Sequence, residues 1–138
     1  MAPLPLPGPY QITQPNEHLL SLLENFAGSP VKIMQPTGNP GEQEWHLQNE
    51  GDSITLRNIK HNLYAGVEGD LRPRAPIVGV PQPFKWKLEN AAERFKYFLY
   101  IDSDDGPLYL EYSLVRIFPP RAALSPQPGE PWTLQFLE

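Results

Sequence analysis

The alternation of hydrophobic and polar residues follows one short motif that occurs three times along the chain. Residues 45–48 (WHLQ), 86–89 (WKLE) and 132–135 (WTLQ) each place an apolar residue at every second position. Alternation with a period of two predicts a β-strand with one buried face. The tryptophans lie 41 and 46 residues apart, and a proline precedes each of them by four or five positions. A repeat of this length predicts three copies of one β unit around a shared core.

Shorter alternating segments predict the remaining strands of each unit. They are residues 10–13, 18–23 and 31–34 in the first unit, 54–57, 63–67 and 77–80 in the second, and 97–100, 108–112 and 115–118 in the third. Together with the tryptophan strands, each unit then has four strands. Three four-stranded units of about 40 residues predict an all-β protein with a β-trefoil fold, in which six strands close a barrel and six form hairpins that cap it.

The same pattern predicts the domain organisation. Residues 1–9 alternate proline with small or apolar residues and are expected to form an extended N-terminal arm. Residues 10–138 are expected to form a single domain, with units at approximately 10–50, 51–92 and 93–138. Closure of the sheet into a barrel removes exposed strand edges, which otherwise invite pairing between molecules.

Composition and charge narrow the class of protein. The chain has 138 residues with three Trp, six Tyr and six Phe, enough aromatic residues to fill the core of one domain. Cysteine is absent, which excludes disulfides, thiolate chemistry and cysteine zinc sites. The net charge of −5 argues against a general nucleic-acid surface. The sequence shows neither a signal peptide nor an apolar stretch of membrane-spanning length, so we expect a cytoplasmic protein without membrane contact; a processed secreted form stays open.

The sequence gives no positive sign of catalysis. His18, His46 and His61 have no partner at metal-ligand spacing, and the acidic run 102–106 lacks the last ligand of a calcium loop, so it is expected to be a hairpin turn. No phosphate loop, nucleophile elbow or dinucleotide fingerprint occurs. We therefore expect no metal, no cofactor and no enzyme activity, and a function carried by loops.

Five segments carry a resemblance to a known family: 54–59 (ITLRNI), 62–67 (NLYAGV), 77–80 (IVGV), 84–88 (FKWKL) and 131–136 (PWTLQF). With them the chain resembles the fungal β-trefoil protease inhibitors, closest to the cospin type of serine protease inhibitor, over nearly its whole length after residue 9. The resemblance implies a trefoil without disulfides or signal peptide. It also implies inhibition of trypsin-like enzymes through one exposed loop, between the second and third strands of the first unit.

In this sequence that loop is residues 24–30, and it contains no Lys or Arg. A trypsin-like pocket selects a cationic side chain, which neither Asn25 nor Phe26 supplies. Phe26 would suit a chymotrypsin-like pocket. Asn25 would suit an asparagine-specific cysteine protease, a class of target for which the related clitocypin and macrocypin trefoils are known.

Arg74 is the basic residue best suited to a protease, and it lies in the matching loop of the second unit. Pro73 fixes its own φ and biases Arg72 toward an extended backbone, and a rigid loop loses little entropy on binding. Arg72 is itself a poor scissile residue because proline follows it, so the reactive bond would join Arg74 to Ala75. The same Pro-Arg-Ala pattern recurs in the third unit with Arg121. The simpler interpretation is that these arginines are solvated loop charges.

A carbohydrate site is the alternative. Residues 43–45 (QEW) match the Gln-x-Trp triplet of ricin-type lectins, in one unit of the three. A sugar site needs an exposed aromatic ring near amide or carboxylate groups, and Tyr64, Tyr109 and Tyr112 with Asn62 or Asp102 are candidates. The same tyrosines could simply pack on the hairpins.

The sequence thus predicts a binding trefoil. A protease inhibitor, with serine proteases as favoured targets, is the leading interpretation, and a carbohydrate-binding trefoil lectin is the alternative. A trefoil that has kept the fold and lost its reactive loop is a third.

Overall fold

The chain forms twelve β-strands in a computed structural model that describes residues 5–15 and 17–137. In chain order they are β1 (Gly8–Gln14), β2 (His18–Ser21), β3 (Lys32–Met34), β4 (Trp45–Glu50), β5 (Ser53–Asn58), β6 (Tyr64–Gly66), β7 (Val78–Val80), β8 (Lys87–Asn90), β9 (Lys96–Ser103), β10 (Gly106–Tyr112), β11 (Ala122–Ser125) and β12 (Trp132–Phe136). No helix forms in the described residues. The all-β prediction is confirmed.

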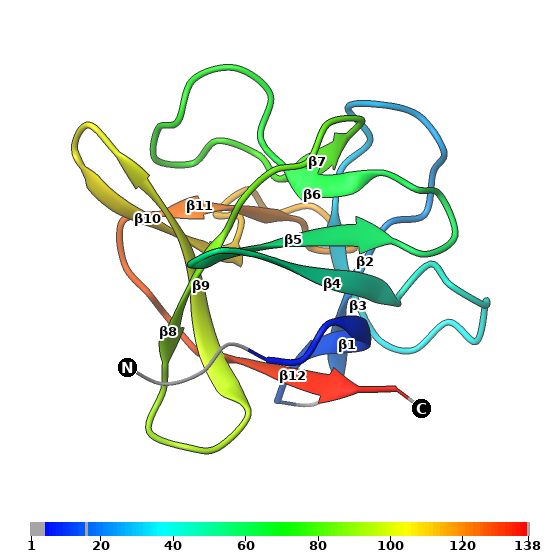
Figure 1. Ribbon diagram of the computed structural model, residues 1–138. Coiled ribbons are helices and arrows are strands. Elements are labelled where there is room, and N and C mark those ends of the chain that lie inside the picture. Colours follow the sequence, from blue (N-terminus) through cyan, green and yellow to red (C-terminus); the bar gives the residue numbers. More distant parts are fainter. Residues whose placement is uncertain (1–4, 16, 138) are drawn as a thin grey trace.

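Six of the strands close a barrel. Antiparallel pairing runs from β12 through β1 and β4 to β5, and from β12 through β9 to β8. A bridge between Ile54 and Trp86 joins β5 to β8 and completes the circle. The other six strands form the hairpins β2–β3, β6–β7 and β10–β11. This is the β-trefoil that the sequence predicted (Figure 1), and Figure 1 places β1 and β12 on the side of the molecule opposite β6 and β7.

A closed ring of three hydrogen bonds joins the hairpins. The N–H of Val31 donates to the carbonyl of Ile77 (3.0 Å), that of Ile77 to Ala122 (3.0 Å), and that of Ala122 to Val31 (2.9 Å). The three residues therefore occupy equivalent positions in the three units. Each of the three residues lies at the end of a hairpin loop, at or just before the strand that follows it. The ring therefore fixes the base of all three loops.

The three tryptophans are equivalent as well. Trp45, Trp86 and Trp132 are fully buried at the centre of the core. The indole Nε1 of each donates to a carbonyl of its own hairpin: Leu20 (2.9 Å), Ala65 (2.9 Å) and Leu110 (3.1 Å). Each repeat thus ties its last strand to its hairpin by the same bond, which satisfies a polar group that would otherwise be buried without a partner.

The third unit differs from its prediction. Residues 115–118 were expected to form its third strand, but the strand is β11, Ala122–Ser125, and residues 113–121 form a loop. The alternation of apolar residues around Arg116 resembles a half-buried strand. However, these side chains face solvent, because Ala122 and not a residue of this segment completes the hydrogen-bonded ring.

Candidate functional site

The loop that the resemblance favours, residues 24–30, folds as a tight turn. The N–H of Ser29 donates to the Phe26 carbonyl (3.2 Å), and the Ser29 hydroxyl donates to the Glu24 carbonyl (3.2 Å). Asn25 and Phe26 are exposed. Both side chains are therefore accessible to a partner, and the preference of this loop for a protease stays a prediction.

Arg74 has a backbone that does not suit a substrate-like bond. Its φ is 72°, in the left-handed region, and its N–H donates to the Leu124 carbonyl at 2.8 Å. The next residue, Ala75, is buried and donates its N–H to the Arg72 carbonyl (3.1 Å). A protease must reach both sides of the scissile bond, and here the bond between Arg74 and Ala75 lies in the buried base of the loop. Arg72 and Pro73 are exposed, and a role for them in binding a protease stays a prediction.

Arg121 is not the structural counterpart of Arg74, although both follow proline. Bridges pair Pro30 with Val78, Pro76 with Ala123, and Arg121 with Lys32. Arg121 therefore occupies the position of Pro30 and Pro76. It is half-buried at the base of its loop, where its carbonyl accepts a hydrogen bond from the N–H of Ser113 (2.7 Å). The recurrence of Pro-Arg-Ala in the sequence is out of register by two residues.

The β10–β11 loop, residues 113–121, is the most exposed apolar segment that the structure describes. Its exposed fractions are 73% for Leu114, 61% for Val115, 42% for Ile117 and 93% for Phe118. Arg116 lies between Val115 and Ile117, and its side chain is exposed too. Soluble proteins rarely expose so many large apolar side chains together unless a partner covers them.

This loop is fixed at its base by two hydrogen bonds, and its chain turns at Arg116. The bond between Ser113 and Arg121 closes its base, and the Ile33 N–H donates to the Pro120 carbonyl (2.8 Å). The N–H of Ile117 donates to the Val115 carbonyl (3.0 Å), so a three-residue turn centres on Arg116. The alternation of apolar residues predicted a strand here, so Arg116 was not among the predicted site residues. The extra length of the third unit between β10 and Trp132 is the signal that could have found it.

A second cluster, the aromatic surface, comprises Phe98 and Tyr100 on β9 and Tyr109 on β10. The ring centroids of Tyr100 and Tyr109 lie 5.7 Å apart, and those of Phe98 and Tyr109 lie 6.4 Å apart. Tyr100 pairs with Tyr109, and directly paired residues have their side chains on one face of a sheet. All three rings are half-buried, so each leaves part of its surface to solvent.

Charged groups border the aromatic surface. On the neighbouring strand β8, Lys87 pairs with Tyr100 and Glu89 pairs with Phe98. The Lys87 ammonium contacts the Asp102 carboxylate at 2.6 Å. Burial, followed by the negative charge of Glu89, raises the pKa of Tyr109, so its hydroxyl keeps its proton. The surface thus combines aromatic faces, hydroxyl donors and carboxylate acceptors.

The other predicted sugar residues lie apart from this surface. Tyr64 on β6 pairs with Val80, and Asn62 accepts a hydrogen bond from Arg57 (2.7 Å). Tyr112 stacks on Trp132, with centroids 6.4 Å apart. Its hydroxyl is within hydrogen-bond distance of His18 Nδ1 (2.9 Å), and it stands three positions from Tyr109, on the opposite face of β10. Of the three candidate tyrosines, only Tyr109 joins an aromatic cluster that faces solvent.

The Gln-x-Trp triplet is structural. The amide nitrogen of Gln43 donates to the Ser21 hydroxyl (3.0 Å) and the Gln35 carbonyl (2.9 Å), and its oxygen accepts from the N–H of Thr37 (3.0 Å). All three partners belong to the protein, and Gln43 is buried.

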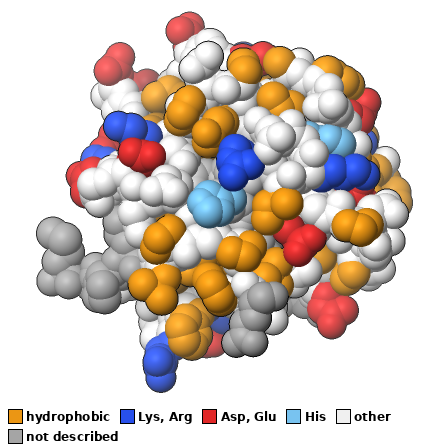
Figure 2. Space-filling view, turned by 45° about the vertical axis from the view of Figure 1, so that its right-hand side comes forward, with side chains coloured by type: hydrophobic (Ala, Val, Ile, Leu, Met, Phe, Trp, Pro, Cys, Tyr) orange, Lys and Arg blue, Asp and Glu red, His pale blue; other side chains and the backbone are white. Residues whose placement is uncertain are grey.

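Charged side chains are scattered over the face of the molecule that Figure 2 shows. On the face that Figure 2 shows, Lys and Arg side chains stand singly among apolar, polar and acidic ones. In the described residues, no group of three or more His, Asp or Glu side chains is arranged to hold a metal ion. Nor does the described chain contain a helix long and apolar enough to cross a membrane.

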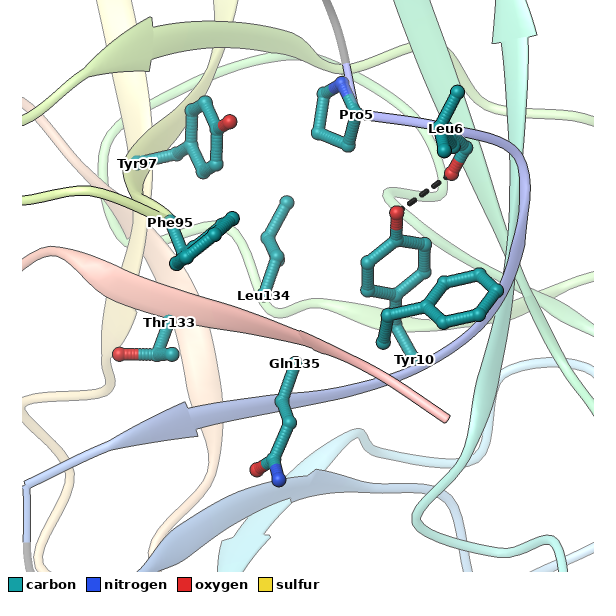
Figure 3. Close-up of a pocket in the computed structure, with 9 residues that line it drawn as sticks. Pro5, Leu6, Tyr10, Phe95, Tyr97, Thr133, Leu134 and Gln135 are labelled. Carbon is teal, nitrogen blue, oxygen red and sulfur yellow. Dashed lines mark hydrogen bonds between the residues drawn. The ribbon is translucent and has the colours of Figure 1, made fainter. Parts of the chain in front are cut away.

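An apolar pocket opens at the end of the barrel where β1 and β12 pair (Figure 3). It has a volume of about 710 Å³. Its lining residues are Pro5, Leu6, Tyr10, Phe95, Tyr97, Thr133, Leu134, Gln135 and Phe136. None of them carries a charge.

Comparison with solved structures confirms the fold. The Rhizoctonia solani agglutinin is 18% identical with a TM-score of 0.79, and the match covers 99% of this chain and 100% of that one. The Macrolepiota procera ricin B-like lectin in complex with lactose is 17% identical (TM-score 0.76; 99% and 100% covered). ThreeFoil, a designed 3-fold symmetric protein, is 15% identical (0.79; 94% and 99%). No family model and no curated protein matches the sequence. At these identities the likeness establishes the β-trefoil and leaves membership of the cospin type unconfirmed.

Proposed function

We propose that this trefoil binds carbohydrate through the aromatic surface of Phe98, Tyr100 and Tyr109. The observation that carries the proposal is the pair of tyrosine rings 5.7 Å apart with carboxylates at their border. Aromatic faces stack on the C–H side of a sugar ring, and carboxylates accept hydrogen bonds from its hydroxyls. The agglutinin and the lactose-bound lectin among the structural neighbours favour this function over protease inhibition, since none of the three neighbours described above is named as an inhibitor.

The test is a glycan array with the purified protein, followed by calorimetric titration of the strongest hit. Tyr109→Ala should weaken binding roughly five- to tenfold, the value of one aromatic stacking contact. Tyr64→Ala is the matched control, because Tyr64 is a half-buried tyrosine on another hairpin and should bind like the wild type. Absence of any glycan ligand, or equal losses in both variants, would refute the proposal.

A second function, inhibition of a trypsin-type serine protease, is favoured by the β10–β11 loop. Arg116 is the cationic side chain that such a pocket selects, and the exposed Val115 and Ile117 on either side can fill the neighbouring subsites. The anchored base limits the entropy that the loop loses on binding. The reactive bond would then join Arg116 to Ile117, and not Arg74 to Ala75 as the sequence predicted.

Titration of trypsin with the protein tests this second function. Arg116→Ala should weaken inhibition by at least about thirtyfold, because it empties the charge-specific pocket, while Arg116→Lys should keep most of it. Arg74→Ala and Arg121→Ala should inhibit like the wild type. If trypsin is not inhibited, or if Arg74→Ala removes inhibition, the β10–β11 loop is not a reactive loop of this kind.

A further inference from the structure

The barrel-end pocket of Figure 3 combines a buried floor with an exposed apolar rim. Tyr10 and Leu134 form the floor and are buried. Leu6, Phe95 and Phe136 form the rim and are exposed, although each is large and apolar. The Phe136 ring stands edge-on to Tyr10, with centroids 5.3 Å apart. A ligand that seats on this floor would also cover apolar rim surface that now faces water.

The backbone of the rim is held in an unusual conformation. Phe95 has φ of 64°, which is rare for a bulky residue. The Leu134 N–H donates to its carbonyl (2.9 Å), and the Arg94 guanidinium lies over its ring at 5.1 Å. Strained conformations of this kind gather at ligand clamps and functional sites. The hydrogen bond from Leu134 and the contact with Arg94 hold Phe95 in this conformation at the mouth of the pocket.

The polar groups of the pocket are few and uncharged. The Tyr10 hydroxyl donates to the Leu6 carbonyl at 2.6 Å, which uses its only proton. The Tyr97 hydroxyl has no hydrogen-bond partner among the described residues, and Figure 3 shows it on the pocket side of its ring. Burial, and next the neighbouring Tyr97, raises the pKa of Tyr10, so a negative charge is disfavoured here. Thr133 and Gln135 also line the pocket, but on β12 their side chains point to the face opposite Leu134. The Tyr97 hydroxyl is therefore the group best placed to orient a ligand on the floor.

We infer that this pocket binds a neutral, mainly apolar small molecule that carries one hydrogen-bonding group for the Tyr97 hydroxyl. Its volume lies within the range of small-molecule sites, which are mostly apolar with a few convergent polar groups. A charged group seated on the floor would lose its hydration without gaining an opposite charge, because none of the lining residues is ionised and the Arg94 guanidinium lies over the Phe95 ring at the rim. The pocket is separate from the aromatic surface and from the β10–β11 loop, since it shares no residue with either.

The experiment uses two fluorescent probes of similar shape. N-phenyl-1-naphthylamine is neutral, and 1-anilinonaphthalene-8-sulfonate adds a negative charge to the same skeleton. We expect saturable binding of the neutral probe to one site per chain, and at least about tenfold weaker binding of the sulfonate. Non-saturable binding of the neutral probe, or equal binding of both, would overturn the inference.

Substitutions then locate the site. Phe136→Asp should weaken binding of the neutral probe by about tenfold, and Tyr97→Phe by a factor of roughly three to ten, the value of one hydrogen bond. Phe118→Asp is the matched control, because it places the same charge on an exposed phenylalanine of the β10–β11 loop. Equal affinity in Phe136→Asp and wild type would overturn the inference. Should Phe136→Asp unfold the chain, Leu6→Asp on the exposed arm replaces it under the same criteria.

Discussion

The backbone N–H of Arg74 donates to the carbonyl of Leu124 across two units of the trefoil, and the bond holds Arg74 in a left-handed conformation. Gly28 occupies the equivalent position in the first unit, with φ of 90° and the same bond to Gly79. The position therefore requires a left-handed backbone in both units, which glycine adopts without strain.

Arg74→Gly should consequently stabilise the protein. The left-handed strain of a non-glycine residue is about 1–2 kcal/mol, and glycine adds about 0.4–1 kcal/mol of unfolded-state entropy, which leaves a net gain of roughly 0.5–1 kcal/mol. Urea denaturation measures the difference. Arg72→Gly is the control, since Arg72 has no positive φ and should only lose stability. A loss of stability in Arg74→Gly equal to that of the control would contradict the prediction.

The tryptophan hydrogen bonds make a second prediction. Trp86→Phe removes the donor to the Ala65 carbonyl, leaves that buried acceptor unpaired and opens a cavity in the core. We expect a loss of roughly 2–4 kcal/mol, and similar losses for Trp45→Phe and Trp132→Phe because the three bonds are equivalent. Tyr100→Phe is the control, since no residue that the structure describes accepts its hydroxyl. Thermal unfolding would show whether one unit departs from the others.

The barrel could be predicted from sequence because its strands carry their own signal. Trp45, Trp86 and Trp132 begin segments in which every second residue is apolar, which predicts the buried face of a strand. Their threefold repeat predicts the number of units. The hairpins depend on pairing between units. Ala122 belongs to β11 because it completes a ring with Val31 and Ile77, residues 91 and 45 positions away. No local pattern contains that information.

The candidate sites were less predictable for the same reason. Tyr109 was identified as an aromatic residue on a hairpin, but its contact with Tyr100 follows from strand register. Arg116 was overlooked because an exposed loop and a half-buried strand can share one alternation of apolar residues. The neighbouring prolines favoured Arg74 as a reactive residue. Its left-handed backbone, which places the following peptide bond at the base of the loop, cannot be read from the sequence.

Acid should destabilise the protein in part through Glu42. Burial alone would raise the pKa of Glu42, but the hydrogen bonds from Thr37 and Asn39, together with Lys60, lower it overall from its ordinary value of 4.5. The unfolded chain therefore binds the proton first, and the stability that Glu42 contributes is lost as the pH falls below 4.5. Glu42→Gln should be less stable than wild type at pH 7, and the difference should shrink at acidic pH. A difference that is constant from pH 7 to pH 3 would contradict this assignment.

Glu111 should have the opposite effect. Burial raises its pKa above 4.5, more than the hydrogen bond from the Tyr112 N–H lowers it. The folded state then binds the proton more tightly than the unfolded chain, so stability falls as the pH rises from 4.5 through the raised pKa. Glu111→Gln cannot titrate and should flatten that decline, which denaturation at a series of pH values would measure. A decline in Glu111→Gln as steep as that of the wild type would contradict the prediction.

The accessibility of the β10–β11 loop predicts the order in which trypsin cleaves after Arg116 and after the three arginines that the sequence favoured. The bond between Arg116 and Ile117 is exposed on both sides, whereas Ala75 and Ala122, which follow Arg74 and Arg121, are buried. Proline after Arg72 blocks that bond. Mass spectrometry during brief digestion should therefore find the cut after Arg116 before any cut after Arg72, Arg74 or Arg121.

The rate of that cut depends on how firmly the loop is held. Ser113 accepts the Val115 N–H with its hydroxyl (3.1 Å), which restrains the chain just before Arg116. Ser113→Ala removes this restraint, frees the loop and should speed the cleavage several-fold, while Ser113→Thr keeps the hydroxyl and should be cut like the wild type. A first cut after Arg74 or Arg121, or equal rates in the two Ser113 variants, would show that the loop is not held as described.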